Sequence, residues 1–203
     1  MKEHNDYILE LPGFVPEYFC KQLITIFENT PNPRPGRVMH DGKALVRPNT
    51  KNTLEHCLCC NSDFEKEYLI CKNFIMKAVS LYLYTLKKEY NYNQELHVFE
   101  TVLNNKLSKN MSPIIQKISN GTKNKWHFDG GIDTKGFVLA ILYLNTLKPE
   151  EGGCTEFGPH GRKIKPECGK IIIFPTVWTY PHRGCKVVNN DKYIVSCMVD
   201  ITS

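Results

Sequence analysis

Three side chains have the types and the spacing that metal chemistry requires: His127 and Asp129 in the motif His-Phe-Asp, and His182 further along the chain. Residues i and i+2 of a β-strand point to the same face, so His127 and Asp129 would share a face while Phe128 packs on the other side. A histidine on a neighbouring strand would complete a set of two imidazoles and one carboxylate. Such a set occupies one face of an octahedral ion and leaves three coordination positions open.

This set is the facial triad that holds Fe(II) in non-haem iron proteins. The pair at 127–129 is a weak signal by itself, because seven histidines and seven aspartates make a chance pair at this spacing easy to find. On the pair alone, a strand histidine that makes a local hydrogen bond is the favoured interpretation. The surrounding sequence reverses that preference.

The elements that must position these residues follow from apolar periodicity. A short strand is predicted at Tyr7–Leu11, and helical spacing predicts helices over Glu17–Asn29 and Asp63–Lys88. Residues 37–53 are predicted to be exposed strand and loop.

Short apolar segments separated by Gly, Pro and Asn follow residue 113, which is typical of a sandwich or jelly roll. We therefore expect an α+β, mainly β fold in one domain over residues 1–203. Residues 1–112 would supply helical support and lid segments, and residues 113–203 a double-stranded β-helix core with the metal site. The predicted strands are Ile114–Ile118, Phe137–Asn145, Cys154–Phe157, Lys170–Phe174, Lys186–Val188 and Tyr193–Asp200.

Composition excludes several classes of protein. The chain has 203 residues, 26 Lys and Arg against 21 Asp and Glu, and no long run of like charges, so neither a nucleic-acid tail nor a polybasic membrane patch is expected. Met1–Glu10 has no signal-peptide apolar region, no stretch approaches about 18 consecutive apolar residues, and nine cysteines are an odd number. We expect a soluble cytoplasmic protein of a reducing compartment. Its 21 lysines and 17 asparagines indicate an AT-rich genome, such as that of a virus or phage.

A set of ordered motifs resembles the prolyl 4-hydroxylase-like branch of the Fe(II)/2-oxoglutarate-dependent dioxygenases. The resemblance is strong over 113–203 and looser before it. The motifs are LPGFVPEYFCKQLI at 11–24, HFD at 127–129, ILYLN at 141–145, EGGCTEF at 151–157, Pro166 and Gly169 before IIIF at 171–174, then His182, and DKY at 191–193.

The resemblance implies Fe(II) held by His127, Asp129 and His182, with 2-oxoglutarate as cosubstrate, O₂ as oxidant and ascorbate as a candidate reductant. It implies that Lys192 pairs with the distal carboxylate of 2-oxoglutarate, because a dianion inside a barrel needs a buried cation. Tyr143 would bond the same carboxylate, and Thr155 would line the cosubstrate pocket.

The substrate implied by the resemblance is a prolyl residue in a peptide or protein, with residues 30–53 and 103–112 as lids. The sequence departs from the family at two positions. Ile118 and Lys117 stand where a tyrosine often contacts the cosubstrate, and Met198 stands where a tryptophan is common. These departures concern the substrate and cosubstrate contacts and not the iron ligands.

Three alternatives stay open. The same chemistry could act on a free amino acid, a lysyl side chain or a nucleobase, although the segment 183–196 lacks the RxNxTxR-like stretch of nucleic-acid demethylases and no basic-aromatic patch replaces it. The chain could instead be a metal-free jelly-roll binding module. It could also be a cupin-like enzyme that uses no 2-oxo acid. The sequence does not indicate an oligomeric state.

Other candidate ligands are weaker. His160 lies in a polar turn and is a poor substitute for His182. The segment from His56 to Cys60 contains Cys57, Cys59 and Cys60, but no second metal-binding pair follows, so structural or incidental thiols are favoured over a zinc site. The remaining cysteines near the predicted strands are interpreted as small core residues: Cys154, Cys168, Cys185 and Cys197.

Overall fold

The computed structural model describes residues 7–40, 43–49, 51–90, 111–130, 136–158 and 161–200. The helices are α1 (Glu17–Asn29) and α2 (Glu65–Tyr90), with 3₁₀ helices η1 (Leu58–Cys60), η2 (Ser62–Phe64) and η3 (Pro149–Glu151). The strands are β1 (Leu9–Leu11), β2 (Arg34–Pro35), β3 (Arg37–His40), β4 (Lys43–Val46), β5 (Leu54–Cys57), β6 (Ile114–Ile118), β7 (Gly136–Tyr143), β8 (Thr155–Phe157), β9 (Arg162–Ile164), β10 (Ile171–Pro175), β11 (His182–Gly184) and β12 (Lys192–Asp200).

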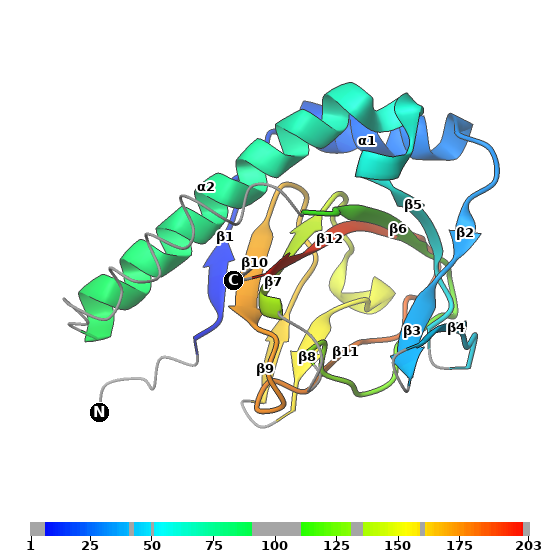
Figure 1. Cartoon of the computed structure of the whole chain (residues 1–203). Coiled ribbons are helices and arrows are strands. Elements are labelled where there is room, and N and C mark those ends of the chain that lie inside the picture. The colour runs from blue at the N-terminus through cyan, green and yellow to red at the C-terminus, as the bar shows by residue number, and fades with distance from the viewer. Residues whose placement is uncertain are drawn as a thin grey trace.

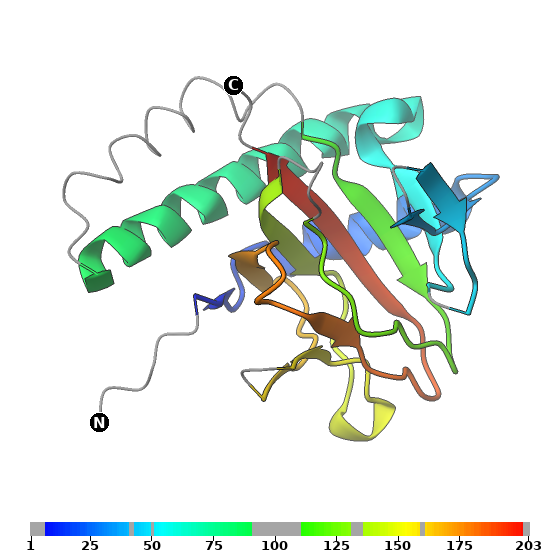
Figure 2. The same ribbon diagram turned by 60° about the horizontal axis from the view of Figure 1, so that its bottom comes forward.

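The strands form two facing antiparallel sheets and a separate hairpin. A seven-stranded sheet has the order β1-β10-β7-β12-β6-β5-β2, a three-stranded sheet has the order β11-β8-β9, and β3 pairs with β4. Helices α1 and α2 cover the outer face of the large sheet, and the small sheet lies on its other side (Figures 1 and 2). This arrangement confirms the predicted mainly β jelly roll with N-terminal supporting helices.

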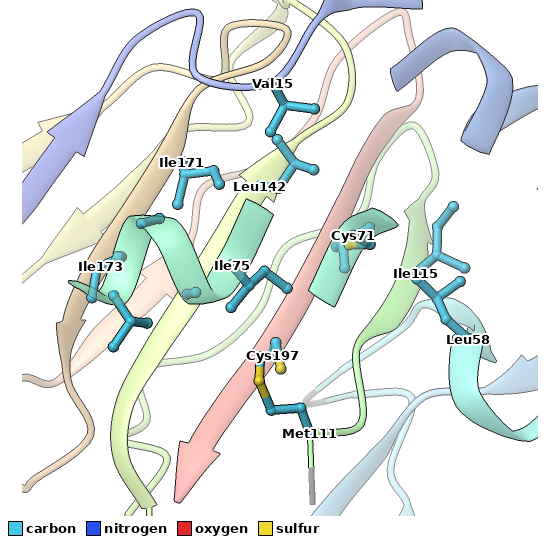
Figure 3. Close-up of a cluster of buried hydrophobic side chains, with 14 of the residues drawn as sticks. Val15, Leu58, Cys71, Ile75, Met111, Ile115, Leu142, Ile171, Ile173 and Cys197 are labelled. Atoms are coloured by element: carbon cyan, nitrogen blue, oxygen red, sulfur yellow. The ribbon is translucent and has the colours of Figure 1, made fainter. Parts of the chain in front are cut away.

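Alternation along the central strand β7 divides the core into two layers. Ala140 and Leu142 belong to the cluster between the large sheet and the helices, where Ile75 of α2 packs among the strand residues (Figure 3). Ile141 and Tyr143 belong to the cluster between the two sheets. Because successive strand residues point to opposite faces, a strand covered on both sides is apolar throughout, as β7 is.

Helix α2 carries its apolar stripe at the predicted residues, and Cys71, Ile75 and Ala78 are buried against the sheet. By length and composition alone, Ser62–Glu89 could also cross a membrane, although the sequence has no run of about 18 consecutive apolar residues. The core helix of a soluble protein passes the same test, and this helix packs one of its faces into the core.

Three expectations about the elements are corrected. Residues 127–129 lie in a loop with an isolated bridge at His127, and Phe128 is 50% exposed, so it does not pack on an opposite sheet face. Val187 likewise makes only an isolated bridge, so 186–188 is not a strand. The N-terminal region supplies more than support and lids, because β1, β2 and β5 are hydrogen-bonded strands of the large sheet.

Candidate metal centre

The structure brings His127, Asp129 and His182 together in the space between the two sheets. The backbone of His127 pairs with His182, the first residue of β11, and the ring centroids lie 4.4 Å apart. Asp129 Oδ1 is 3.8 Å from His127 Nε2, and Asp129 Oδ2 is 3.3 Å from His182 Nε2. One ligand atom from each residue lies within 4.8 Å of the others, so the three could hold one metal ion.

Backbone carbonyls orient both imidazoles. His127 Nδ1 is 2.8 Å from the Lys125 carbonyl oxygen, and His182 Nδ1 is 3.1 Å from the Tyr180 carbonyl oxygen. A carbonyl can only accept, so each Nδ1 carries the proton and each Nε2 presents a lone pair toward Asp129. Burial lowers the pKa of His182, and His127 lowers it further, while Asp129 acts in the opposite direction. A neutral imidazole is the form that binds a metal.

Asp129 gives a direct test of whether a cation fits. Its Oδ2 atom is buried and has no hydrogen-bond partner, although His182 Nε2 lies nearby. With the proton of His182 on Nδ1, these two atoms are both acceptors, and a buried carboxylate oxygen without a partner is costly. A cation bound by both atoms would remove this cost. The donor set of two nitrogens and one carboxylate matches the ligands that Fe(II) prefers.

These side chains line a cavity of about 410 Å³. Thr155 and Lys192 also line it, so the metal ligands and the predicted cosubstrate residues share one space. Phe174 packs its ring edge-on against His182 with a centroid separation of 4.8 Å, which supports the imidazole from the core side.

Lys192 is buried, with 4% of its surface exposed. Its Nζ atom donates to the Gly153 carbonyl at 2.6 Å, and no carboxylate among the described residues forms an ion pair with it. Burial without an anionic partner lowers the pKa of Lys192 to about 7. A carboxylate ligand would supply the missing charge, as the distal carboxylate of 2-oxoglutarate would.

Gly153 holds that carbonyl in place through a backbone conformation that favours glycine, with φ of 67°. A Cβ at this position would lie 2.6 Å from Leu147 Cδ1. Gly152, which also has a positive φ, ends helix η3.

Tyr143 lies directly behind the cavity wall. Its hydroxyl is hydrogen-bonded to the Thr155 hydroxyl at 2.7 Å, and its ring lies under Lys192 with Nζ 5.1 Å from the centroid. The side chain is fully buried, and burial raises the pKa of Tyr143 despite the bond to Thr155. Thr155 lines the cavity as predicted, whereas Tyr143 reaches it only through Thr155 and Lys192.

Both departures from the family pattern lie at the cavity. Ile118 is buried in the cavity wall and pairs across the sheet with Lys192, so an apolar surface replaces the expected tyrosine. Met198 lines the cavity from the other end of β12. Both substitutions make the wall less polar.

Several cavity residues were not identified from the sequence. Arg37, Val38, Arg47 and Lys51 bring the β3–β4 hairpin and the segment after it to the cavity, within the segment 30–53 that the sequence predicts to be a lid. Asn124 also lines it, and its Oδ1 atom is buried without a partner. The sequence did not indicate that the charged residues of this exposed segment line the cavity, because their position depends on the tertiary structure.

The cysteine interpretation needs one correction. Cys154 and Cys185 form a disulfide between the start of β8 and the end of β11, so they are not simply small core residues. Cys197 is a free, buried thiol as expected, while Cys168 is free and half-buried. His160, the weaker third ligand, and the predicted lid residues 103–110 lie outside the described residues.

Comparisons with known proteins agree with the fold. Residues 113–199 match the family model described as the 2OG-Fe(II) oxygenase superfamily. The chain is similar to a viral collagen prolyl hydroxylase from Paramecium bursaria Chlorella virus-1 in complex with 2OG, with a TM-score of 0.65 and 19% identity over 98% of both chains. A search of curated protein sequences gives no significant match.

Two cellular proteins have similar folds. For a Pseudomonas putida prolyl-4-hydroxylase the TM-score is 0.65 at 13% identity, covering 97% of this chain and 94% of the other. A Trichoplax adhaerens prolyl hydroxylase in complex with a hypoxia inducible factor peptide fragment has a TM-score of 0.68 at 11% identity. The match covers 97% of this chain and 84% of the other. At these identities the likeness shows the fold alone.

Proposed function

We propose that the chain, whose residues 113–199 match the family model of the 2OG-Fe(II) oxygenase superfamily, is an Fe(II)- and 2-oxoglutarate-dependent dioxygenase that hydroxylates a prolyl residue in a peptide or protein. The observation that carries the proposal is the shared cavity, in which a carboxylate with one buried oxygen that lacks a hydrogen-bond partner and a buried lysine without an anion face the same space. A cation satisfies the first group and a carboxylate ligand the second.

In this proposal His127, Asp129 and His182 hold Fe(II), and Lys192 binds the distal carboxylate of 2-oxoglutarate. When bound, Fe(II) with 2-oxoglutarate and O₂ supplies the oxidation of a C–H bond, with succinate and CO₂ as products. The chain's own contribution is positional. The two carbonyls at Lys125 and Tyr180 keep both imidazoles in the ligand form, and the apolar wall at Ile118 limits the entry of water.

The open side of the cavity supports a macromolecular substrate. The β3–β4 hairpin supplies Arg37 and Val38 to its lining, and exposed Phe128 adds apolar surface beside the metal ligands. A peptide could therefore contact the hairpin while one side chain reaches the metal ligands. The similar structures are named as prolyl hydroxylases, and one contains a peptide fragment, which supports a prolyl substrate here.

The first experiment tests the cofactors. The purified chain is titrated without oxygen with Fe(II) and then 2-oxoglutarate, and the weak visible metal-to-ligand charge-transfer band is followed. We expect the band in the wild type and in Lys123→Ala, an exposed residue of the same loop, and its loss in His127→Ala. No band in the wild type, or an unchanged band in His127→Ala, would contradict the proposal.

The second experiment tests the substrate. Succinate release is measured with proline-containing peptides and with matched peptides in which alanine replaces proline, and mass spectrometry locates the added oxygen. If succinate release depends instead on free amino acids, lysyl peptides or nucleobases, the prolyl assignment is wrong and that compound is the substrate. A protein that binds no iron and releases no succinate would be a binding module, and turnover unchanged in Lys192→Met would indicate an enzyme without a 2-oxo acid.

A further inference from the structure

A second group of potential metal ligands lies where β5 ends and η1 begins. The Cys57 Sγ atom is 3.3 Å from Cys59 Sγ and 3.2 Å from Cys60 Sγ, and the last two sulfurs are 3.5 Å apart. These three sulfurs form a near-equilateral triangle and could hold one metal ion. None of the three residues lines the cavity that contains Asp129, so the group is separate from the iron site.

Local backbone structure forces the three thiols together. Cys57 is the extended residue that caps η1, and the single 3₁₀ turn that follows, with about three residues per turn, brings Cys60 back beside it. Cys57 is held by its pairing with Ile114 of β6, and Leu58 anchors the turn with a fully buried side chain and a backbone bond to the Pro113 carbonyl. The triangle therefore belongs to a fixed turn at the edge of the core.

The size of the triangle suits a small thiophilic cation. Sulfurs bound to tetrahedral zinc at roughly 2.3 Å lie about 3.8 Å apart, so each sulfur needs to move by only a few tenths of an ångström. An ion at that distance from all three sulfurs would sit roughly 1 Å out of their plane, which leaves one coordination position open. The Ser112 hydroxyl, 3.6 Å from Cys59 Sγ, or a water molecule can complete the set.

Thiols gain little from one another without a metal, because S–H is a weak donor and sulfur a weak acceptor. Cys59 and Cys60 are exposed and Cys57 is half-buried, so an ion can reach the site from solvent. From this geometry we propose that Cys57, Cys59 and Cys60 bind one zinc(II) ion as three thiolates. The lack of a second cysteine pair argued against zinc in the sequence, but three convergent sulfurs with an open fourth position do not need that pair.

The site has a structural consequence. Ser112 lies two residues before the paired start of β6 at Ile114, so a zinc ion that involves Ser112 would join the η1 turn to the strand that neighbours β12. The zinc ion would also hold the η1 turn, which directly precedes η2 and α2 in the chain. Zinc binding should therefore stabilise the folded chain independently of the iron site.

The test measures zinc uptake with the iron site removed. The full chain carrying Asp129→Ala is reduced, freed of metal and titrated with zinc(II) in competition with a chromophoric chelator. We expect one zinc per chain, a rise in melting temperature on zinc addition, and, with cobalt(II), a near-ultraviolet thiolate-to-metal charge-transfer band. Adding Cys57→Ser, Cys59→Ser and Cys60→Ser together should remove all three signals, while Cys168→Ser, a free cysteine outside the cluster, should retain them.

The proposal would be overturned by the absence of stoichiometric zinc in the Asp129→Ala chain, or by an equal zinc affinity after the triple substitution. Rapid formation of a disulfide among the three cysteines with no zinc uptake under reducing conditions would also overturn it, and mass spectrometry of peptides covering residues 57–60 detects that outcome. If the triple variant fails to fold, Cys60→Ser alone is used, because Cys60 is exposed, and it must weaken zinc binding.

Discussion

His127 and His182 are paired through an isolated antiparallel bridge, with the N–H of each donating to the carbonyl of the other at 3.0 and 2.8 Å. The pairing places both imidazoles on one side of the bridge, and the Nδ1 bonds to nearby carbonyls turn both Nε2 atoms toward Asp129. The site is thus set by backbone hydrogen bonds before any metal arrives, so substitutions of the ligands should change metal binding far more than the fold.

The first prediction concerns the stability of the metal-free protein. Removing the Asp129 carboxylate by Asp129→Ala should cost little stability in the presence of a chelator, because its buried Oδ2 atom has no hydrogen-bond partner to lose. In the wild type, Fe(II) at 100 times its dissociation constant should add roughly 2.7 kcal/mol to the free energy of unfolding, or about 5–10 °C in melting temperature. Thermal melts under anaerobic conditions, with and without Fe(II), measure both effects.

The control for this prediction is Asp191→Ala, which removes a half-exposed carboxylate that does not line the cavity. This variant should keep the full response to Fe(II), whereas Asp129→Ala should lose it. An Asp129→Ala protein that Fe(II) stabilises as much as the wild type would show that the ion binds elsewhere.

The second prediction is a pH dependence set by Lys192. Its pKa is lowered to about 7 in the free protein, so above pH 7 the amine is neutral and must take up a proton to bind a carboxylate. The affinity for 2-oxoglutarate should therefore fall by up to about tenfold per pH unit above 7 and be nearly constant below it. Anaerobic titration calorimetry in buffers of different ionisation enthalpy should detect proton uptake at pH 8.

The lowered pKa of Lys192 also determines how the free energy of unfolding changes with pH. Between pH 7 and the ordinary lysine pKa of 10.5, the unfolded chain binds the proton that the folded chain has released, so stability rises with pH across this window. Lys192→Met should flatten that rise and stabilise the ligand-free protein at pH 6, while Lys163→Met, an exposed lysine, should do neither. Equal pH profiles for the wild type and Lys192→Met would refute a buried, neutral amine.

Local patterns in the sequence were enough to place much of the fold and the proposed triad. Alternating or continuous apolar residues gave the strands at 114–118 and in β7, β10 and β12, and the 3.6-residue stripe gave α2. His127, Asp129 and His182 converge as expected, although through a backbone bridge and not through a regular strand. The spacing of His127 and Asp129 therefore indicated the candidate ligands correctly, although the two residues lie in a loop and not in the strand that was assumed.

Features that depend on the relative placement of distant segments could not be derived in this way. The disulfide follows from the register of β8 and β11, in which Gly184 faces Thr155 and so brings Cys185 next to Cys154. The position of the β3–β4 hairpin beside the cavity depends on tertiary packing, and the exposed residues of the two strands carry no periodic signal. The bond between Tyr143 and Thr155 likewise joins β7 of the large sheet to β8 of the small sheet, and no local pattern encodes how the two sheets face each other.

The third prediction concerns that bond. Thr155→Val leaves the fully buried Tyr143 hydroxyl without its partner, so it should lower the free energy of unfolding by about 1–3 kcal/mol. Adding Tyr143→Phe removes the orphaned hydroxyl, so the double variant should be more stable than Thr155→Val alone. Urea denaturation of the four proteins in this cycle measures the coupling. Purely additive effects would mean that the two hydroxyls do not interact.

The last prediction concerns the disulfide between Cys154 and Cys185. It closes a loop with a sequence separation of 31 residues, and it ties the strand that begins at Thr155 to the strand that begins at His182. Its loss in Cys154→Ser/Cys185→Ser should lower the free energy of unfolding by roughly 2–4 kcal/mol. A reductant should destabilise the wild type by a similar amount and leave the double variant unchanged, while Cys168→Ser should behave as the wild type. Thiol counting on protein purified without reductant gives the decisive measurement, because nine free thiols would show that the bond does not form and that both residues remain reduced, as the sequence first suggested.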